Sequence, residues 1–208
     1  SMVSHGQAPL ANHFLSDLSQ APEVSELVLT ENIPDSALHP PPGLPVLTHR
    51  NPSPMGFAGN HNQAFVGSEQ TFFCVANPDI RLLSNPFPGL LASLQDPRAG
   101  LDDGRHHLSP LGASAPRPVE WVAGMFLLFR AEAFRDVGGF DAKFHLYYED
   151  VDICARLWKS GWKVMCDPGV TVVHEAQRAS RHDFQYMRWH AVSMARYFRK
   201  HLGRLPQV

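Results

Sequence analysis

Apolar runs of strand length alternate with segments of helical period through the first half of the chain. The runs at 24–32 and 71–76 are rich in β-branched and aromatic residues, whereas Leu10, Phe14 and Leu18 repeat at a helical spacing. Such alternation is typical of βαβ units. It predicts an α/β fold with a mostly parallel central sheet flanked by helices.

The second half of the sequence predicts four further elements. We expect a strand over 119–129, a helix over 151–161, one or two short strands over 162–174 and a long basic amphipathic helix over 183–203. Residues 95–118 show no period and contain several glycines, prolines and aspartates, which predicts a loop. With 208 residues the chain is expected to form a single domain.

Composition narrows the class of protein. The formal net charge of -2 argues against binding nucleic acid through phosphate neutralisation. The three cysteines are odd in number and lack metal-ligand spacing, which indicates free thiols in a reducing compartment. The apolar run at 121–129 is far shorter than the ~20 residues that span a bilayer. No signal peptide is recognisable, so we expect a cytoplasmic protein.

Polar residues at two predicted strand ends are candidates for metal chemistry. Asp79 follows a buried strand that Asn77-Pro78 ends, and a carboxylate there can hold a divalent metal bridging a diphosphate. An ordinary Asx-Pro turn explains the same residues. His174 ends the β-branched run at 170–173 and could be a metal ligand, although a lone histidine is more often structural.

Glycines and asparagines cluster at 56–62. Gly56 and Gly59 permit tight turns, and Asn60 and Asn62 place amide groups near a helix N-terminus, where anions or a ribose bind well. Neither dinucleotide nor P-loop glycine patterns are present. An N-capped helix is the simpler interpretation of this segment.

Three carboxylates crowd together at 149–152. Acids are favourable in the first turn of a helix, and that explains one of them. It explains three less well, because like charges repel. In a partly buried site, one of these carboxylates could serve as a general base.

Taken in order, these motifs resemble a known enzyme family. The segments "VSHG", "GFAGNHN", "NPDI", "VGGFDAKFHLYYEDVDICARL" and "VVH" resemble the family 2 glycosyltransferases of GT-A fold, a Rossmann-like fold for nucleotide-diphospho-sugars. The similarity is greatest to the bacterial rhamnosyltransferase-like subgroup. It runs from residue 3 to about 200 and is most specific over 119–174.

The resemblance implies a domain organisation. Residues 3–94 would form the nucleotide-binding half, 95–118 a loop, 119–180 the acceptor and catalytic half, and 181–208 the basic helix of a single 1–208 domain. The residues implied to bind the nucleotide-sugar are Ser4, His5, Gly6, Glu31, Asn32, Asp35, Gly56, Phe57, Asn60, Asn62, Asn77 and Asp79. Glu31 stands where the family usually has aspartate.

The resemblance also implies the cofactor and the catalytic residues. The family's metal motif falls on Asn77-Pro78-Asp79, which keeps only its last acid, so Mg²⁺ or Mn²⁺ would be held by Asp79 and His174. Asp150 would deprotonate the acceptor, with Glu149 beside it, and one base with in-line attack gives inversion. The residues implied to shape the donor and acceptor pocket are Trp121, Gly124, Gly139, Phe140, Asp141 and Tyr148.

The implied function is transfer of a sugar to a hydroxyl of a growing bacterial surface glycan, such as an O-antigen or lipopolysaccharide. The implied donor is dTDP-rhamnose or a UDP-sugar, the acceptor is lipid-linked or an oligosaccharide, and a homodimer is left open. One alternative is a non-catalytic nucleotide-sugar-binding or scaffold subunit. Another is a sugar nucleotidyltransferase, which would need a glycine-rich basic loop that "SHGQAPLANH" lacks.

The basic C-terminal helix has two interpretations. Its arginines and lysines are interleaved with aromatic residues, a pattern that suits the surface of an anionic membrane and hence peripheral contact at the inner face of the cytoplasmic membrane. A helix that covers the core and exposes a solvated basic face fits equally well.

Overall fold

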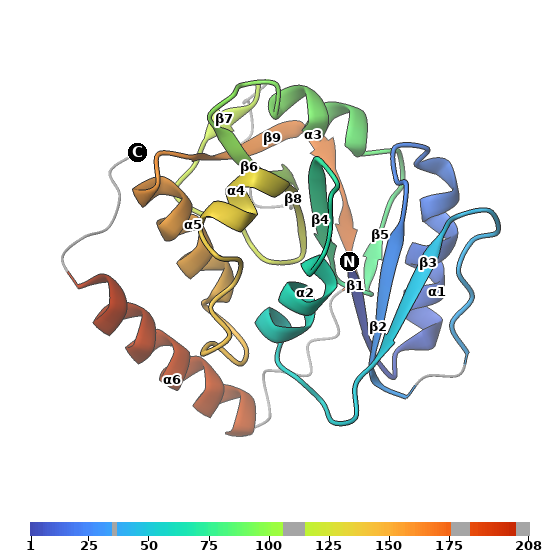
Figure 1. Ribbon diagram of the computed structural model, residues 1–208, viewed down its shortest axis with the longest axis horizontal. Coiled ribbons are helices and arrows are strands. Elements are labelled where there is room, and N and C mark those ends of the chain that lie inside the picture. Colours follow the sequence, from blue (N-terminus) through green and yellow to red (C-terminus); the bar gives the residue numbers. More distant parts are fainter. Residues whose placement is uncertain (35–36, 106–114, 176–183, 203–208) are drawn as a thin grey trace.

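The computed structural model describes residues 1–34, 37–105, 115–175 and 184–202. An eight-stranded sheet with strand order β3-β2-β1-β4-β8-β6-β9-β7 forms its centre (Figure 1). The strands of this sheet are β1 (Met2–His5), β2 (Leu27–Ile33), β3 (Val46–Arg50), β4 (Phe72–Ala76), β6 (Ala99–Arg105), β7 (Arg117–Pro118), β8 (Phe126–Arg130) and β9 (Lys163–Thr171). The helices are α1 (Ala8–Asp17), α2 (Phe57–Phe65), α3 (Phe87–Ser93), α4 (Ala131–Asp136), α5 (Glu149–Lys159) and α6 (Phe184–His201), with a 3₁₀ turn at Leu18–Gln20.

The first four strands confirm the predicted parallel arrangement. β1 pairs in parallel with β2 and with β4, and β2 pairs in parallel with β3. Helix α1 connects β1 to β2, and α2 connects β3 to β4. The carboxyl ends of β1 and β2 therefore meet at one edge, where ligands of open α/β sheets bind.

The second half of the sheet is mixed. β8 pairs antiparallel with β4 and β6, whereas β6 and β9 are parallel. The predicted loop at 95–118 is wrong in two places, because Ala99–Arg105 is strand β6 between β8 and β9, and Arg117–Pro118 is the short strand β7. Strand β6 could not be recognised from its sequence, because Asp102 and Asp103 stand where a buried strand usually has apolar residues. Both are nevertheless buried, at 0% and 2% exposed. Strand pairing on both sides outweighs the poor local pattern.

The predicted strand at 119–129 begins later than expected, at Phe126. Residues 119–125 are irregular because the chain turns there, with the N–H of Met125 donating to the carbonyl of Ala123 at 2.8 Å. The indole N–H of Trp158 holds the start of this segment through the carbonyl of Val119 at 3.1 Å. Within the same segment, the N–H of Gly124 donates to Oδ2 of Asp150 in α5. Two short strands that form a separate pair, β5 (Ile80–Arg81) and β10 (Val173–His174), lie beside the sheet.

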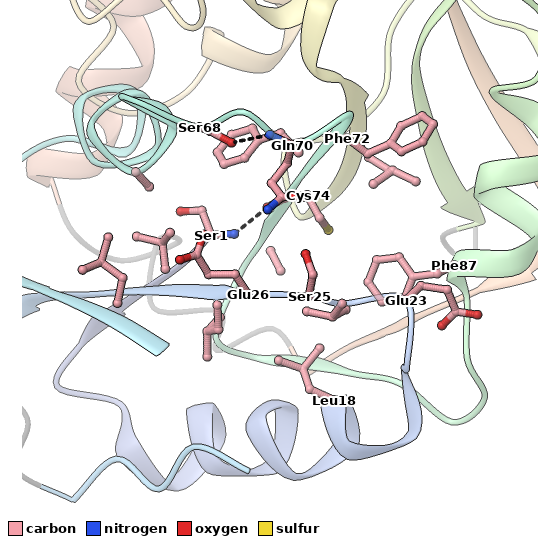
Figure 2. A pocket seen from close by; sticks show the side chains of 18 of the residues that line it. Ser1, Leu18, Glu23, Ser25, Glu26, Ser68, Gln70, Phe72, Cys74 and Phe87 are labelled. Carbon is pink, nitrogen blue, oxygen red and sulfur yellow. Dashed lines mark hydrogen bonds between the residues drawn. The ribbon is translucent and has the colours of Figure 1, made fainter. Parts of the chain in front are cut away.

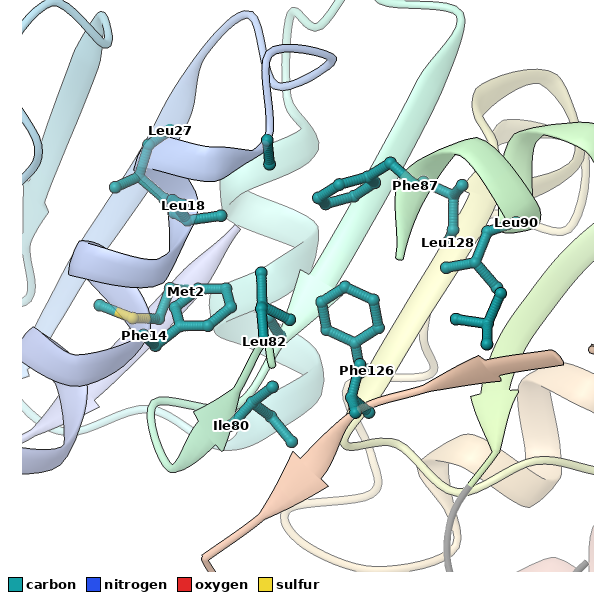
Figure 3. Packing of buried hydrophobic residues seen from close by; sticks show 14 of the residues in the cluster. Met2, Phe14, Leu18, Leu27, Ile80, Leu82, Phe87, Leu90, Phe126 and Leu128 are labelled. Carbon is teal, nitrogen blue, oxygen red and sulfur yellow. The ribbon is translucent and has the colours of Figure 1, made fainter. Parts of the chain in front are cut away.

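Alternating side chains of the strands fill two cores. On one face Phe126 and Leu128 pack with Phe14 of α1 and Leu90 of α3 (Figure 3). On the other face the intervening residues of β8 pack against α2, α4 and α5, with Phe134 at the centre of an aromatic group. Each fully buried large side chain of this kind contributes ~1.5–3 kcal/mol.

Helix α6 packs beside α5 and the segment before it (Figure 1). Tyr197 is buried against Phe144 and Ala155. The helix therefore covers protein on one side, as one of the two interpretations of its sequence expected. None of the helices in the described ranges is long and apolar enough to cross a membrane.

Candidate active site

The carboxyl ends of β1 and β2 bring three predicted nucleotide-binding residues together. Ser4 and Asn32 are buried, whereas His5 is exposed. The side-chain amide nitrogen of Asn32 lies 3.1 Å from Nδ1 of His5 and 2.9 Å from the carbonyl oxygen of Met55, to which it donates. Gly6 follows with a φ of +78°, a conformation that glycine adopts without strain. Asn32 thus connects the first strand end to the loop that precedes α2.

A chain of asparagines shapes that loop. Asn51 donates to Oδ1 of Asn32 at 2.7 Å and to Oδ1 of Asn60 at 2.6 Å. The amide of Asn60 donates to the carbonyl oxygen of Gly56 at 3.1 Å. The side chains predicted to face a nucleotide are therefore engaged in holding the 51–56 backbone, and their contact with a ligand stays a prediction.

Glu31 forms an ion pair with Arg50, which was not among the predicted site residues. Its carboxylate accepts from Nε of Arg50 at 3.0 Å, across the parallel β2–β3 pair. The guanidinium itself is largely exposed at this edge. The sequence carries a signal for this residue, since Arg50 ends the segment "VLTHR" much as Glu31 and Asn32 end "VLTEN". Asp35, the other acid predicted here, lies outside the described residues.

Asn62 joins α2 to the segment with the glycine pair. Its side-chain amide donates to the carbonyl oxygen of Phe140 at 2.7 Å and its Oδ1 accepts the Phe140 N–H at 2.9 Å. Gly139 has a φ of +68°, and a Cβ there would lie 2.5 Å from Oδ1 of Asn62. The Asn62 side chain is therefore bound to the backbone of Phe140 by two hydrogen bonds inside the fold. Phe140 itself is only 2% exposed.

The predicted metal residues Asp79 and His174 are brought together across 95 positions of sequence. Nε2 of His174 lies 3.1 Å from Oδ2 of Asp79. The other carboxylate oxygen of Asp79 is buried and has no hydrogen-bond partner. The backbone N–H of Asn77 donates to the carbonyl of Met125 at 2.8 Å, which places this turn beside the Gly124 segment.

These two side chains fit a divalent ion as part of a larger ligand set. A carboxylate oxygen without a partner and an imidazole nitrogen are donors that suit Mn²⁺, and oxygen donors suit Mg²⁺. In the described ranges no three or more acidic, histidine or cysteine residues gather into a metal cluster. A metal at Asp79 would therefore need oxygens from a ligand such as a diphosphate.

Glu149 and Asp150 begin α5 directly after two tyrosines with left-handed backbone. Tyr147 and Tyr148 have φ values of 68° and 67°. Oδ2 of Asp150 accepts from the N–H of Gly124 at 2.9 Å, and its Oδ1 accepts from the N–H of Val151 at 2.8 Å. Burial raises the pKa of Asp150, and these hydrogen bonds oppose that rise.

Glu149 is the more strongly perturbed of the pair. Burial, followed by repulsion from Asp150, raises its pKa to about 8. Its Oε2 is buried without a hydrogen-bond partner. At neutral pH Glu149 is therefore largely protonated, which lets the neighbouring carboxylate of Asp150 carry the negative charge.

Residues from the N-terminal ends of α2 and α5 both lie next to Gly124. A Cβ there would lie 3.3 Å from Cβ of Asp150 and 3.6 Å from Cζ of Phe57. The N–H of Phe57 in turn donates to the carbonyl oxygen of His145 at 3.2 Å. The structure thus brings together the predicted residues Phe57, Gly124 and Asp150.

Three other residues predicted to shape the donor and acceptor pocket lie in different environments. Trp121 is 51% exposed, so its ring is accessible at the surface. Asp141 accepts from Nζ of Lys200 at 2.7 Å and from the N–H of Lys143 at 3.0 Å, so its carboxylate serves the fold. Tyr148 packs against α6, with its ring 5.3 Å from that of His190.

The raised pKa of Glu149 predicts a pH-dependent effect on stability. A carboxyl whose pKa is raised in the folded state contributes stability below pH ~4.5 and loses it as the pH rises through about 8. Glu149→Gln should therefore raise the melting temperature by ~2–4 °C or more at pH 9, with a difference that shrinks toward pH 4.5. Exposed Glu132, replaced by glutamine, is the control. Melting curves of Glu149→Gln that parallel wild type at every pH would contradict the buried, unpartnered carboxyl.

A cavity of ≈ 360 Å³ lies away from these residues (Figure 2). Its lining includes Leu27 and Val28 at the start of β2, Phe72 at the start of β4, and Ser1, whose ammonium donates to the carbonyl of Cys74 at 2.6 Å. These are the amino ends of the parallel strands. The cavity is therefore not the candidate active site, which lies at the carboxyl ends.

Comparison with known proteins supports the assignment that the site suggests. Residues 101–200 match the model of glycosyl transferase family group 2. The chain is 28% identical to an N-acetylglucosaminyl-diphospho-decaprenol L-rhamnosyltransferase of Mycobacterium tuberculosis, over 87% of this chain and 76% of the relative. It is 39% identical to rhamnosyltransferase WbbL of Escherichia coli, over 38% of this chain and 30% of that protein.

Solved structures share the fold. The mannosyltransferase PcManGT from Pyrobaculum calidifontis, in complex with GDP-Man and Mn²⁺, has a TM-score of 0.72 at 17% identity, covering 95% of this chain and 63% of that one. GalNAc-T7 with UDP, GalNAc and Mn²⁺ has a TM-score of 0.71 at 14% identity, covering 83% and 42%. The chain thus spans less than two thirds of these two structures. The predicted GT-A fold is confirmed, and the comparisons support a glycosyltransferase: residues 101–200 match the family group 2 model, and the chain is similar to bacterial rhamnosyltransferases.

Proposed function

We propose that this glycosyltransferase inverts the anomeric carbon of a nucleotide-activated sugar, with Asp150 as the base that deprotonates the acceptor hydroxyl. One observation carries the proposal: the half-buried Asp150 carboxylate is fixed by the N–H groups of Gly124 and Val151, with a raised pKa. A positioned carboxylate of raised pKa is a stronger base than a freely exposed one.

Glu149 supports this role by remaining protonated. Two adjacent ionised carboxylates would repel one another, and the raised pKa of Glu149 avoids that. A single ionised carboxylate favours direct displacement by the acceptor over a route through a glycosyl-enzyme. That second route would need a nucleophilic acid on the donor face of the sugar.

Charge on the departing nucleotide diphosphate needs stabilisation from the other end of the site. Asp79 and His174 would hold Mg²⁺ or Mn²⁺ there together with diphosphate oxygens. When bound, the metal would supply positive charge to the leaving group. The two solved relatives in fold that contain Mn²⁺ make such a cofactor chemically reasonable.

The relatives suggest the donor and the acceptor. Because the similar mycobacterial and E. coli proteins are rhamnosyltransferases, we propose rhamnose from dTDP-rhamnose, or a sugar from a UDP donor, for this chain. The mycobacterial name, which includes a diphospho-decaprenol, supports a lipid-linked acceptor in a bacterial surface glycan. A homodimer stays a prediction.

Thermal stability with nucleotides tests the donor class. We expect one of dTDP, UDP, GDP and CDP to raise the melting temperature, and Mn²⁺ or Mg²⁺ to strengthen the shift. A ligand at ~100 times its dissociation constant adds ~2.7 kcal/mol of stability. If none of the four nucleotides shifts the melt with or without metal, the donor site is absent and the non-catalytic scaffold becomes the better interpretation.

Peripheral membrane contact is a further part of the proposal. The side of α6 away from the core exposes Phe184, Met187, Val192 and Phe198, at 77%, 57%, 49% and 55%, and Arg188 is exposed among them. Exposed apolar and basic residues on one helix suit an anionic lipid surface, which would bring the site to a lipid-linked acceptor.

Liposome flotation tests that contact. Wild-type protein should float with vesicles that contain anionic lipid, and Met187→Gln with Phe198→Gln should reduce the floating fraction several-fold, because both substitutions remove exposed apolar area. The same substitutions should leave the melting temperature nearly unchanged. Equal flotation of wild type and the double variant would remove α6 as the contact.

A further inference from the structure

The turn that presents the base is held in an unfavourable backbone conformation. Tyr147 and Tyr148 are consecutive non-glycine residues with positive φ, a strained conformation that persists only where the surrounding structure holds it. Glu149 and Asp150 follow at once. The orientation of the Asp150 side chain therefore depends on the contacts that hold the two tyrosines in this conformation.

Helix α6 makes the contacts that hold the turn. The ring of His190 lies 5.3 Å from the rings of both Tyr147 and Tyr148. The ring of Tyr197 lies 5.6 Å from that of Tyr148. Oγ of Ser193, which is 2% exposed, donates to the carbonyl of Leu146 at 2.9 Å. Three successive turns of α6 thus contact the turn that precedes the base.

A buried carboxylate fixes the other end of α6. Asp152 is 0% exposed, and its oxygens lie 2.8 Å from Nε of Arg156, Nε2 of His201 and Nζ of Lys200. Lys200 also pairs with Asp141 at 2.7 Å. A buried carboxylate requires such partners. Asp152 stands two residues after Asp150 on the same helix, so this pairing ties α6 to the element that carries the base.

We propose that α6 is a positioning element for the base, acting through Lys200 and Asp152 and through the ring contacts with Tyr147 and Tyr148. The inference rests on the proposed role of Asp150. If α6 shifts, the left-handed turn relaxes and the Asp150 carboxylate moves from its place beside Gly124. Donor binding at β1, β2 and Asp79 does not involve these contacts. Misplacement of a reacting group by ~1 Å can cost ~10²-fold in rate.

Two adjacent cations on α6 provide a matched test. Lys200→Gln removes the charge that pairs with Asp152, whereas Arg199→Gln removes an exposed charge next to it. With a soluble acceptor, Lys200→Gln should lower kcat ~10-fold or more while the KM for the donor changes less than ~2-fold. Lys200→Arg should restore most of kcat, and Arg199→Gln should match wild type.

A second variant and one control separate this inference from the proposed function. Asp152→Asn, checked for a native melting transition, should show the same loss of kcat at constant donor KM. If folded Lys200→Gln and Asp152→Asn both keep wild-type kcat while Asp150→Asn is inactive, α6 does not position the base and Asp150 keeps its role. If Asp150→Asn is fully active, the base assignment fails, and the inference fails with it.

Discussion

Asp150→Asn should lower the rate of sugar transfer by ~10²–10⁴-fold, the contribution expected of a general base. Asparagine has nearly the shape of aspartate and can still accept the N–H of Gly124, which aspartate accepts at 2.9 Å. It cannot accept a proton from an acceptor hydroxyl. The loss should therefore appear in kcat, with donor binding close to that of wild type, as measured by steady-state kinetics and by the nucleotide-induced rise in melting temperature.

Glu149→Gln is the control for this result. It removes the neighbouring carboxyl and keeps Asp150, so a large loss of kcat confined to Asp150→Asn would assign the base to that position. The pH profile adds a second check. Because burial raises the pKa of Asp150, the acidic limb of kcat should lie above the ordinary aspartate value of ~3.9. Full activity of Asp150→Asn would remove Asp150 from the mechanism.

Much of the fold could be predicted from hydrophobic periodicity. The parallel strands and α1, α2 and α5 follow apolar patterns of period 2 or 3.6 in the sequence. Strand β6 could not be predicted in this way, since Asp102 and Asp103 interrupt its pattern. Burial raises the pKa of Asp102 to about 7, so a proton offsets part of the cost of placing this acid in the sheet.

The site was only partly predictable for a different reason. Asp79 and His174 were singled out separately, and the fold places them 3.1 Å apart. Local sequence, in contrast, indicates which side chains are polar but not what they bind. Asn60 and Asn62 were expected to face a nucleotide, whereas both make hydrogen bonds within the fold. The partners of Asp152 on α6 lie nearly fifty residues away, and no local pattern indicates such a contact.

Asp79→Asn should remove the dependence of nucleotide binding on Mn²⁺ or Mg²⁺. Asp79 has a buried carboxylate oxygen without a hydrogen-bond partner, and a metal is a natural partner for it. Asparagine keeps the side-chain volume and loses the negative charge, so the attraction for a divalent ion falls. Replacing a residue that only supports a metal ligand lowers metal affinity ~10–100-fold. Replacing a direct ligand should lower it at least as much. When the metal concentration is limiting, the rate of sugar transfer by Asp79→Asn should fall at least as much as its metal affinity.

The matched control for Asp79→Asn is Glu175→Gln, because Glu175 is an exposed acid whose N–H donates to the carbonyl of Asp79 at 2.8 Å. It removes a nearby charge and leaves both proposed ligands. Melting curves over a Mn²⁺ titration at fixed nucleotide should show a metal-dependent shift for wild type and Glu175→Gln, a weakened one for His174→Ala, and almost none for Asp79→Asn. A full shift in Asp79→Asn would mean that a metal is held by the nucleotide and by residues other than this pair, and that the single acid kept from the family's motif has a purely structural role.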